Sequence, residues 1–169
     1  AQRLIAHEVG IQRERVMISA THTHSASSAL GNRFEVKQQL DDYQQFVARR
    51  IADGVRRAVN TLRPAEIGYG VAAAPEHVFN RRWFMRPGTV PINPFGKEDL
   101  VKMNPPVASP NLTETAGPTD PEVSLLSVRE PGGAPISLFA SYSLHYVGGV
   151  GKGHISADYF AIFCAEIAR

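Results

Sequence analysis

The sequence has very little cysteine, no long apolar run and almost no net charge. Its single cysteine, Cys164, cannot form an internal disulfide, so cysteine usage does not assign the protein to an oxidising or a reducing compartment. No apolar run reaches the roughly 18 residues that a helix needs to cross a bilayer, and no signal-peptide pattern opens the sequence. The 18 basic and 16 acidic residues give a net charge of +2, which implies no general electrostatic attraction to nucleic acid.

The composition that remains is typical of a globular protein. Hydrophobic residues make up 43% of the sequence and charged residues 20%, a balance found in folded chains rather than disordered ones. A length of 169 residues is enough for one domain with its own core. Because the sequence begins and ends within helical patterns, we expect residues 1–169 to be part of a single domain that is truncated at both ends.

The most informative stretch is a short apolar run followed at once by two histidines. Residues Val16–Ala20 predict a buried strand. Side chains alternate along a strand, so His22 and His24 would project into one space beyond its end. Neutral imidazole is a common zinc ligand, and Thr21 and Ser25 could hold the rings through their second nitrogens. The alternative is that both histidines are polar residues that leave a strand and bond to loop backbone.

Hydrophobic periodicity predicts an α/β fold in which helices pack on a mixed β-sheet. Helices are expected at residues 2–9, at residues 38–62 and after residue 155. Strands are expected at residues 65–74, 123–129 and 136–144. The last two strands are joined by a short glycine-rich turn and should form an antiparallel hairpin.

A proline-rich stretch runs from Pro75 to Pro121. Loops longer than about 15 residues are uncommon unless they serve a site or are disordered, and the aromatic residues here argue against disorder. We therefore expect a long ordered loop excursion in which a largely buried Trp83 anchors the backbone of Arg81. The guanidinium could then address a carbonyl or an anionic group. The alternative is that Arg81 and Arg82 are solvated arginines beside a packed tryptophan.

A third histidine, His145, also lies where a predicted strand gives way to a glycine-rich loop. Asp158, at the start of the final helix, could cap that helix or accept a hydrogen bond from a ligand histidine. The other histidines are expected to be surface or structural residues, and they are His7, His77 and His154.

Five of these segments occur in a fixed order: Ile18–Ser25, Asn80-Arg81, Gly117–Val123, His145 and Ile155–Tyr159. Together they resemble the N-terminal catalytic domain of the neutral/alkaline (non-lysosomal) ceramidase family. The resemblance implies a zinc-dependent amidase that cleaves N-acylsphingosines with metal-activated water. It implies that His22 and His145 bind zinc, while His24 and Arg81 contact the reacting centre. It also implies a lipid-like N-acyl substrate, peripheral membrane contact, no nucleic-acid partner, and a secreted or periplasmic location.

The sequence departs from that family at positions beside the expected metal. The family's remaining zinc ligands, a glutamate and a tyrosine, would lie beyond Arg169. Ceramidases have glycine-proline after the first histidine motif and proline-threonine after the second, whereas this sequence has Ala26-Ser27-Ser28 and Tyr146-Val147-Gly148. Two alternatives therefore stay open: a zinc amidase or esterase with a non-sphingolipid substrate, and a non-catalytic lipid- or glycan-binding member of the fold.

Overall fold

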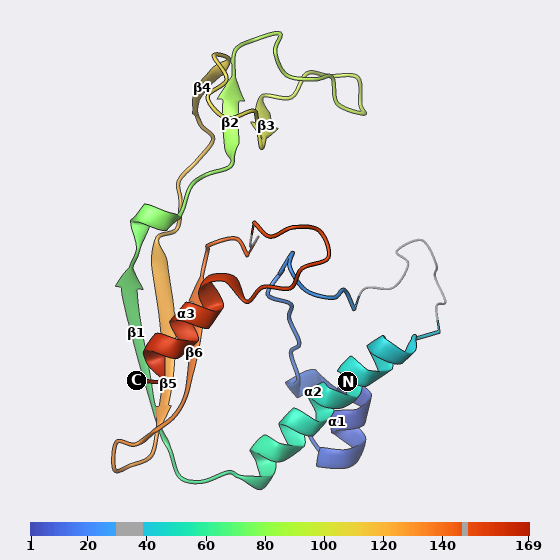
Figure 1. The fold of residues 1–169 in the computed structure, drawn as a ribbon, viewed down its shortest axis with the longest axis vertical. Coiled ribbons are helices and arrows are strands. Elements are labelled where there is room, and N and C mark those ends of the chain that lie inside the picture. Colours follow the sequence, from blue (N-terminus) through green and yellow to red (C-terminus); the bar gives the residue numbers. More distant parts are fainter. Residues whose placement is uncertain (30–38, 147–148) are drawn as a thin grey trace. The chain divides into compact units, whose positions relative to one another are not determined.

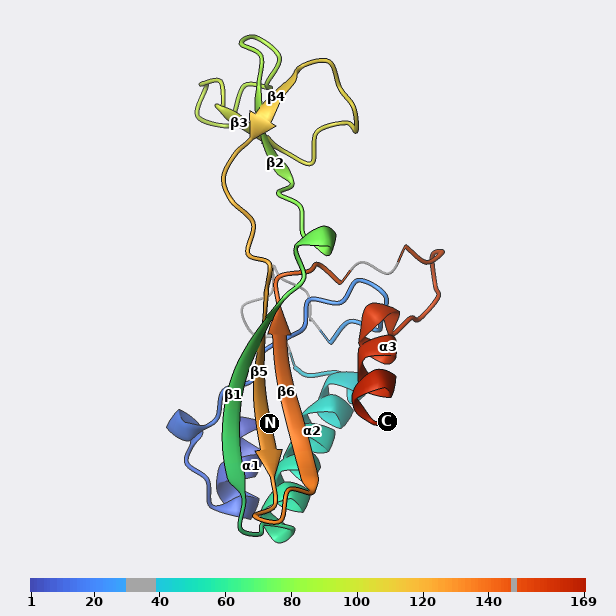
Figure 2. The same cartoon turned by 90° about the vertical axis from the view of Figure 1, so that its left-hand side faces the viewer.

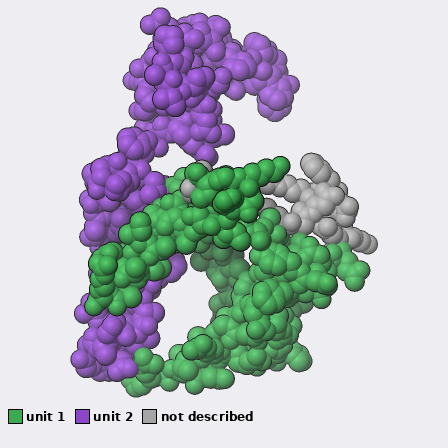
Figure 3. All heavy atoms as spheres, viewed as in Figure 1, with its two compact units in different colours: residues 1–64, 145–169 green, residues 65–144 purple. Residues whose placement is uncertain are grey.

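The computed structural model describes residues 1–29, 39–146 and 149–169. The chain divides into two compact units, with residues 1–64 and 145–169 in unit 1 and residues 65–144 in unit 2 (Figure 3). The described residues form three α-helices and two three-stranded sheets, which confirms the predicted α/β class. The single domain expected from the sequence stays a prediction. Among the helices that the structure describes, none has the length and apolar character needed to cross a membrane.

The helices of unit 1 lie close to their predicted positions (Figure 1). They are α1 (Gln2–Val9), α2 (Asp42–Asn60) and α3 (Asp158–Ile167), and a short 3-10 helix spans Arg13–Arg15. Helix α1 ends at Gly10, whose φ of 79° is readily adopted only by glycine. Helix α2 confirms the longer predicted helix, although residue 38 lies outside the described residues.

A reciprocal cap fixes the start of α2. The backbone N–H of Gln44 donates to Oδ1 of Asp41 over 2.7 Å, and the backbone N–H of Asp41 donates to Oε1 of Gln44 over 3.0 Å. Two amide groups that would otherwise lack helical partners are satisfied in this way. The cap explains why the helix begins at Asp42, four residues after the position that periodicity alone predicts.

Helices α1 and α2 pack against each other around Ile5 and Ala52, which are both buried. An ion-pair network crosses the same helix pair, because the carboxylate of Glu8 accepts from Arg49 at 2.7 Å and from Arg56 at 3.2 Å. The hydrogen bond from Arg49 is the main reason that the pKa of Glu8 is lowered. Apolar burial and these partly exposed ion pairs together join α1 to α2.

The larger sheet of unit 2 contains the hairpin that the sequence predicts. Its strands are β1 (Glu66–Ala73), β5 (Glu122–Arg129) and β6 (Pro135–Tyr142), and β5 lies between the other two (Figure 2). All pairs are antiparallel, with Tyr69 opposite Leu126 and Leu126 opposite Phe139. A turn closed by the N–H of Gly133 donating to the carbonyl of Glu130 joins β5 to β6. The hairpin is therefore confirmed.

The proline-rich stretch is ordered, as predicted, and it also contains short strands that the sequence pattern did not indicate. It contains a second antiparallel sheet in the order β3–β2–β4, formed by β2 (Arg82–Met85), β3 (Val101–Met103) and β4 (Leu112–Thr115). These strands are three or four residues long, which is too short for alternation to appear above the surrounding prolines and glycines. Trp83 pairs with Lys102 and Thr115 within this sheet.

Candidate metal centre

The segment that carries the first two histidines is not a strand, so this prediction is wrong. After the 3-10 helix the backbone N–H of Val16 donates to the carbonyl of Arg13, and residues 16–20 are in neither a helix nor a strand. Met17 and Ile18 are exposed. A short apolar run forms a strand only where a neighbouring strand pairs with it through backbone hydrogen bonds. No described strand pairs with residues 16–20.

The rings of His22 and His24 nevertheless lie close together, although the alternation of side chains along a strand is not the reason. His22 has a φ of 60°, a left-handed conformation that few residues other than glycine adopt. This turn brings the His22 ring within 4.8 Å of the His24 ring, measured between centroids. Positive φ at non-glycine residues is concentrated at functional sites, where the surrounding structure holds the strained conformation.

His145 completes a cluster with these two residues, although it lies 121 residues from His24 in the sequence. Its ring centroid lies 4.9 Å from that of His22 and 4.8 Å from that of His24. The Nε2 atoms of His22 and His24 are 3.1 Å apart, and those of His24 and His145 are 3.2 Å apart. We call these three residues the histidine cluster; they all belong to unit 1.

The chemistry of the cluster suits a cation better than it suits hydrogen bonding among the rings. Nε2 of His24 is close to both neighbouring Nε2 atoms, yet a ring nitrogen carries either one hydrogen or one in-plane lone pair. One nitrogen therefore cannot form two good hydrogen bonds in this arrangement. A metal ion that accepts a lone pair from each ring removes the conflict, because all three nitrogens then act in the same way.

Two of the nitrogen separations are close to those of a tetrahedral metal site. Ligand nitrogens bonded to zinc at about 2.0–2.1 Å lie about 3.3–3.4 Å apart when the geometry is tetrahedral. The two measured separations, 3.1 and 3.2 Å, are close to this value, and the ligand atoms of the cluster all lie within 4.8 Å of one another. All three histidines are exposed, so a fourth position would be open to water or substrate. The three histidines could therefore hold a metal ion.

The position of His24 differs from the role that the resemblance implies. The sequence assigns His22 and His145 to the metal and keeps His24 beside it. In the structure the Nε2 atom of His24 lies 3.1 Å from that of His22 and 3.2 Å from that of His145, so His24 has the geometry of a third ligand. The spacing of two histidines across one residue was a signal for this, because both rings of such a pair can reach one ion.

Two of the residues expected to support the histidines, Ser25 and Asp158, make other contacts. Thr21 is exposed, and the buried hydroxyl of Ser25 donates to the carbonyl of Ser156 over 3.3 Å. Oδ1 of Asp158 accepts from the backbone N–H of Tyr159 over 2.7 Å, and Oγ of Ser156 accepts from the N–H of Asp158 over 3.0 Å. The first of the two roles predicted for Asp158, capping of the final helix, is wrong, because Asp158 is the first residue of α3 and the N-cap is Ala157, with no side-chain cap hydrogen bond.

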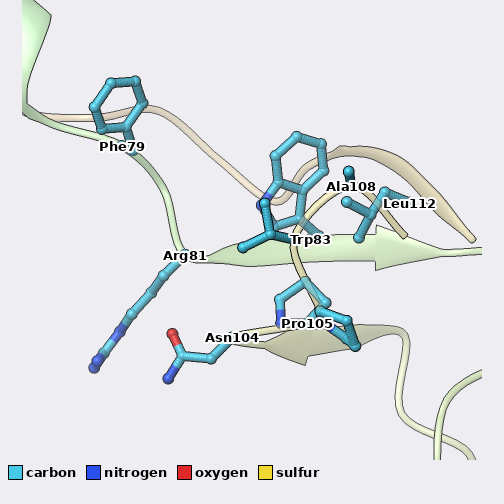
Figure 4. Close-up of a pocket in the computed structure, with 9 residues that line it drawn as sticks. Phe79, Arg81, Trp83, Asn104, Pro105, Ala108 and Leu112 are labelled. Carbon is cyan, nitrogen blue, oxygen red and sulfur yellow. The ribbon is translucent and has the colours of Figure 1, made fainter. Parts of the chain in front are cut away.

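Arg81 belongs to unit 2, where it lines a cavity of about 490 Å³ together with Trp83 and Asn104. Figure 4 shows its guanidinium turned away from the indole of Trp83. Trp83 is half-buried rather than largely buried, because the sheet that carries it has only three short strands. The start of β2 is held by Asn80, whose Nδ2 donates to the carbonyl of Gly117 over 3.0 Å and whose Oδ1 accepts from the N–H of Arg82 over 2.9 Å.

Comparisons of the chain with protein-family models, with curated proteins and with solved structures find no match. The geometry of the histidine cluster is therefore the basis for a function, and the resemblance to ceramidases stays a prediction from the sequence.

Proposed function

We propose that the chain forms the metal-binding part of a zinc-dependent hydrolase that cleaves the amide bond of an N-acylsphingosine or a similar N-acyl lipid. The observation that carries the proposal is the convergence of three Nε2 atoms from two distant segments. Imidazole nitrogen suits zinc, copper, iron and nickel, and among these zinc commonly combines three protein ligands with an open fourth position in hydrolytic enzymes. The amide and lipid part of the proposal comes from the ordered sequence segments.

Each part of the chain has a defined task in this proposal. The histidine cluster binds the metal through ring nitrogens that each provide a lone pair. A zinc ion bound there would supply Lewis acidity and activate a water molecule. The exposure of the rings leaves room for the carbonyl of a substrate. An N-acyl lipid substrate also implies that the protein meets a lipid surface.

The proposal is tested by the activity of the purified protein on a panel of amides and esters. The panel contains an N-acylsphingosine, an N-acyl amino acid and an ester of the same acyl chain. We expect hydrolysis of the N-acylsphingosine that is lost after metal removal with a chelator and restored by zinc. Hydrolysis that survives complete metal removal would contradict the proposal. Activity on the ester or the N-acyl amino acid alone would support a related hydrolase with another substrate.

Arg81 is proposed to stabilise the negative charge that develops on the substrate carbonyl oxygen, a role that rests on the resemblance. Replacing Arg81 with alanine should lower kcat by about 100- to 1,000-fold, the effect of losing one donor to such an oxygen. Zinc content, measured by mass spectrometry, should not change. The control is Arg82→Ala, one residue further along the chain, which should leave kcat nearly unchanged. Equal losses from both variants would contradict this role for Arg81.

A further inference from the structure

The residue that follows His145 is buried although the histidine itself is exposed. Tyr146 has an exposed fraction of 8% and is one of the few deeply buried apolar residues in the described part of the chain. Its ring meets α3, with its centroid 4.8 Å from that of Phe160 and 6.1 Å from that of Tyr159, both in edge-on geometry. Such aromatic contacts are specific in orientation as well as apolar. The backbone next to His145 is therefore fixed to the first turn of α3.

Tyr146 is also bonded directly to the segment that carries the other two histidines. Its backbone carbonyl accepts a hydrogen bond from the N–H of His24 over 3.1 Å. This bond joins a residue adjacent to His145 with His24 itself. The separation of the two histidine-bearing segments is thus set at the backbone, one residue away from the rings.

The carbonyl of Ser156 joins the same two segments a second time. It accepts from the hydroxyl of Tyr146 over 2.6 Å and from the hydroxyl of Ser25 over 3.3 Å. The N–H of Ser156 in turn donates to the carbonyl of Ser25 over 3.0 Å. Ser25 follows His24 in the sequence and has an exposed fraction of 2%. The backbone of one residue, Ser156, therefore holds the neighbours of His24 and His145 together.

We infer that Tyr146 is a positioning residue of the histidine cluster, and that it acts through its hydroxyl on Ser156 and its carbonyl on His24. This inference rests on the proposed metal site. Metal ligands keep their affinity only when groups behind them hold them in place, since loss of such a group typically lowers affinity about 10- to 100-fold. The rings of the cluster are exposed, whereas Ser25 and Tyr146 beside them are buried, so the buried residues provide this support.

The test compares Tyr146→Phe with the wild type in a zinc titration monitored by competition with a chromophoric chelator. Phenylalanine keeps the ring contacts to α3 and removes only the hydroxyl. We expect the dissociation constant for zinc to rise about tenfold, and the visible spectrum of the cobalt-substituted protein to change in intensity. Tyr69→Phe is the matched control, because that tyrosine is exposed and its hydroxyl lies 3.4 Å from that of Ser124 in unit 2.

A second measurement in metal-free protein separates this inference from the proposed function. Nuclear Overhauser contacts between the ring protons of His24 and His145 should be present in the wild type and in Tyr69→Phe, and weaker in Tyr146→Phe. If the wild type binds no zinc, the proposed function fails, and the ring contacts alone decide the role of Tyr146. Unchanged ring contacts and unchanged zinc affinity in Tyr146→Phe would overturn the inference.

Discussion

Replacing His24 with alanine should lower the affinity of the protein for zinc by more than about 100-fold, since losing an outer-shell partner alone typically costs 10- to 100-fold. The reason is that the Nε2 atom of this ring lies 3.1 Å from that of His22 and 3.2 Å from that of His145, where it can bind the same ion. Without it only two nitrogens remain, and catalytic zinc sites usually have three protein ligands. Zinc content after dialysis and a competition titration both measure the effect.

The matched control for this experiment is His77→Ala, which removes a histidine of unit 2 that lies outside the cluster. It should leave zinc affinity unchanged. One other outcome would assign His24 a role beside the metal instead of on it. If His24→Ala binds zinc as tightly as the wild type but turns over substrate more slowly, His24 is a catalytic group beside the metal, as the resemblance implies.

Replacing Ile5 with alanine should lower the free energy of unfolding by about 2–4 kcal/mol. Ile5 is fully buried, with an exposed fraction of 0%, and it lies on α1 where that helix packs against α2. Truncation removes buried methyl groups and leaves a cavity that the short helix can fill only in part. Urea denaturation followed by far-ultraviolet circular dichroism measures the change.

Ile67→Ala is the matched control, since the same side chain is 71% exposed on β1 of unit 2. We expect it to cost less than about 1 kcal/mol, the range of strand propensity alone. Similar losses at the two positions would mean that Ile5 is not a principal contact between α1 and α2.

The helices and the hairpin could be predicted because their signals are local. Helix α2 has apolar residues at helical spacing over five turns, and α1 ends in a glycine with the expected left-handed conformation. The hairpin of β5 and β6 has two β-rich runs on either side of a glycine turn. In each case the residues that determine the element lie next to one another in the sequence.

The errors lie where structure depends on distant partners. Residues Val16–Ala20 have the composition of a strand, but no described strand pairs with them. The strands β2, β3 and β4 have little alternation of their own and are defined by their pairing across turns. A single sequence contains no direct record of such pairings, so neither outcome could be read from it.

The sequence predicted which residues form the candidate site better than it predicted how they are arranged. His22, His24 and His145 were all singled out, and the structure brings them together. The place of His24 as a possible third metal ligand depends on two features. They are the left-handed turn at His22 and the hydrogen bond from the N–H of His24 to the carbonyl of Tyr146. Both are tertiary features, and the second joins segments that are more than 100 residues apart.

The central claim is that the histidine cluster binds one metal ion, and a cobalt titration of the metal-free protein tests it most directly. Visible absorption reports coordination, because four-coordinate cobalt absorbs much more strongly than cobalt in water. We predict saturable binding of one equivalent per chain, with bands of four-coordinate intensity that disappear when His22, His24 and His145 are all replaced with alanine. No saturable binding, or the same spectrum in the triple variant, would contradict the claim.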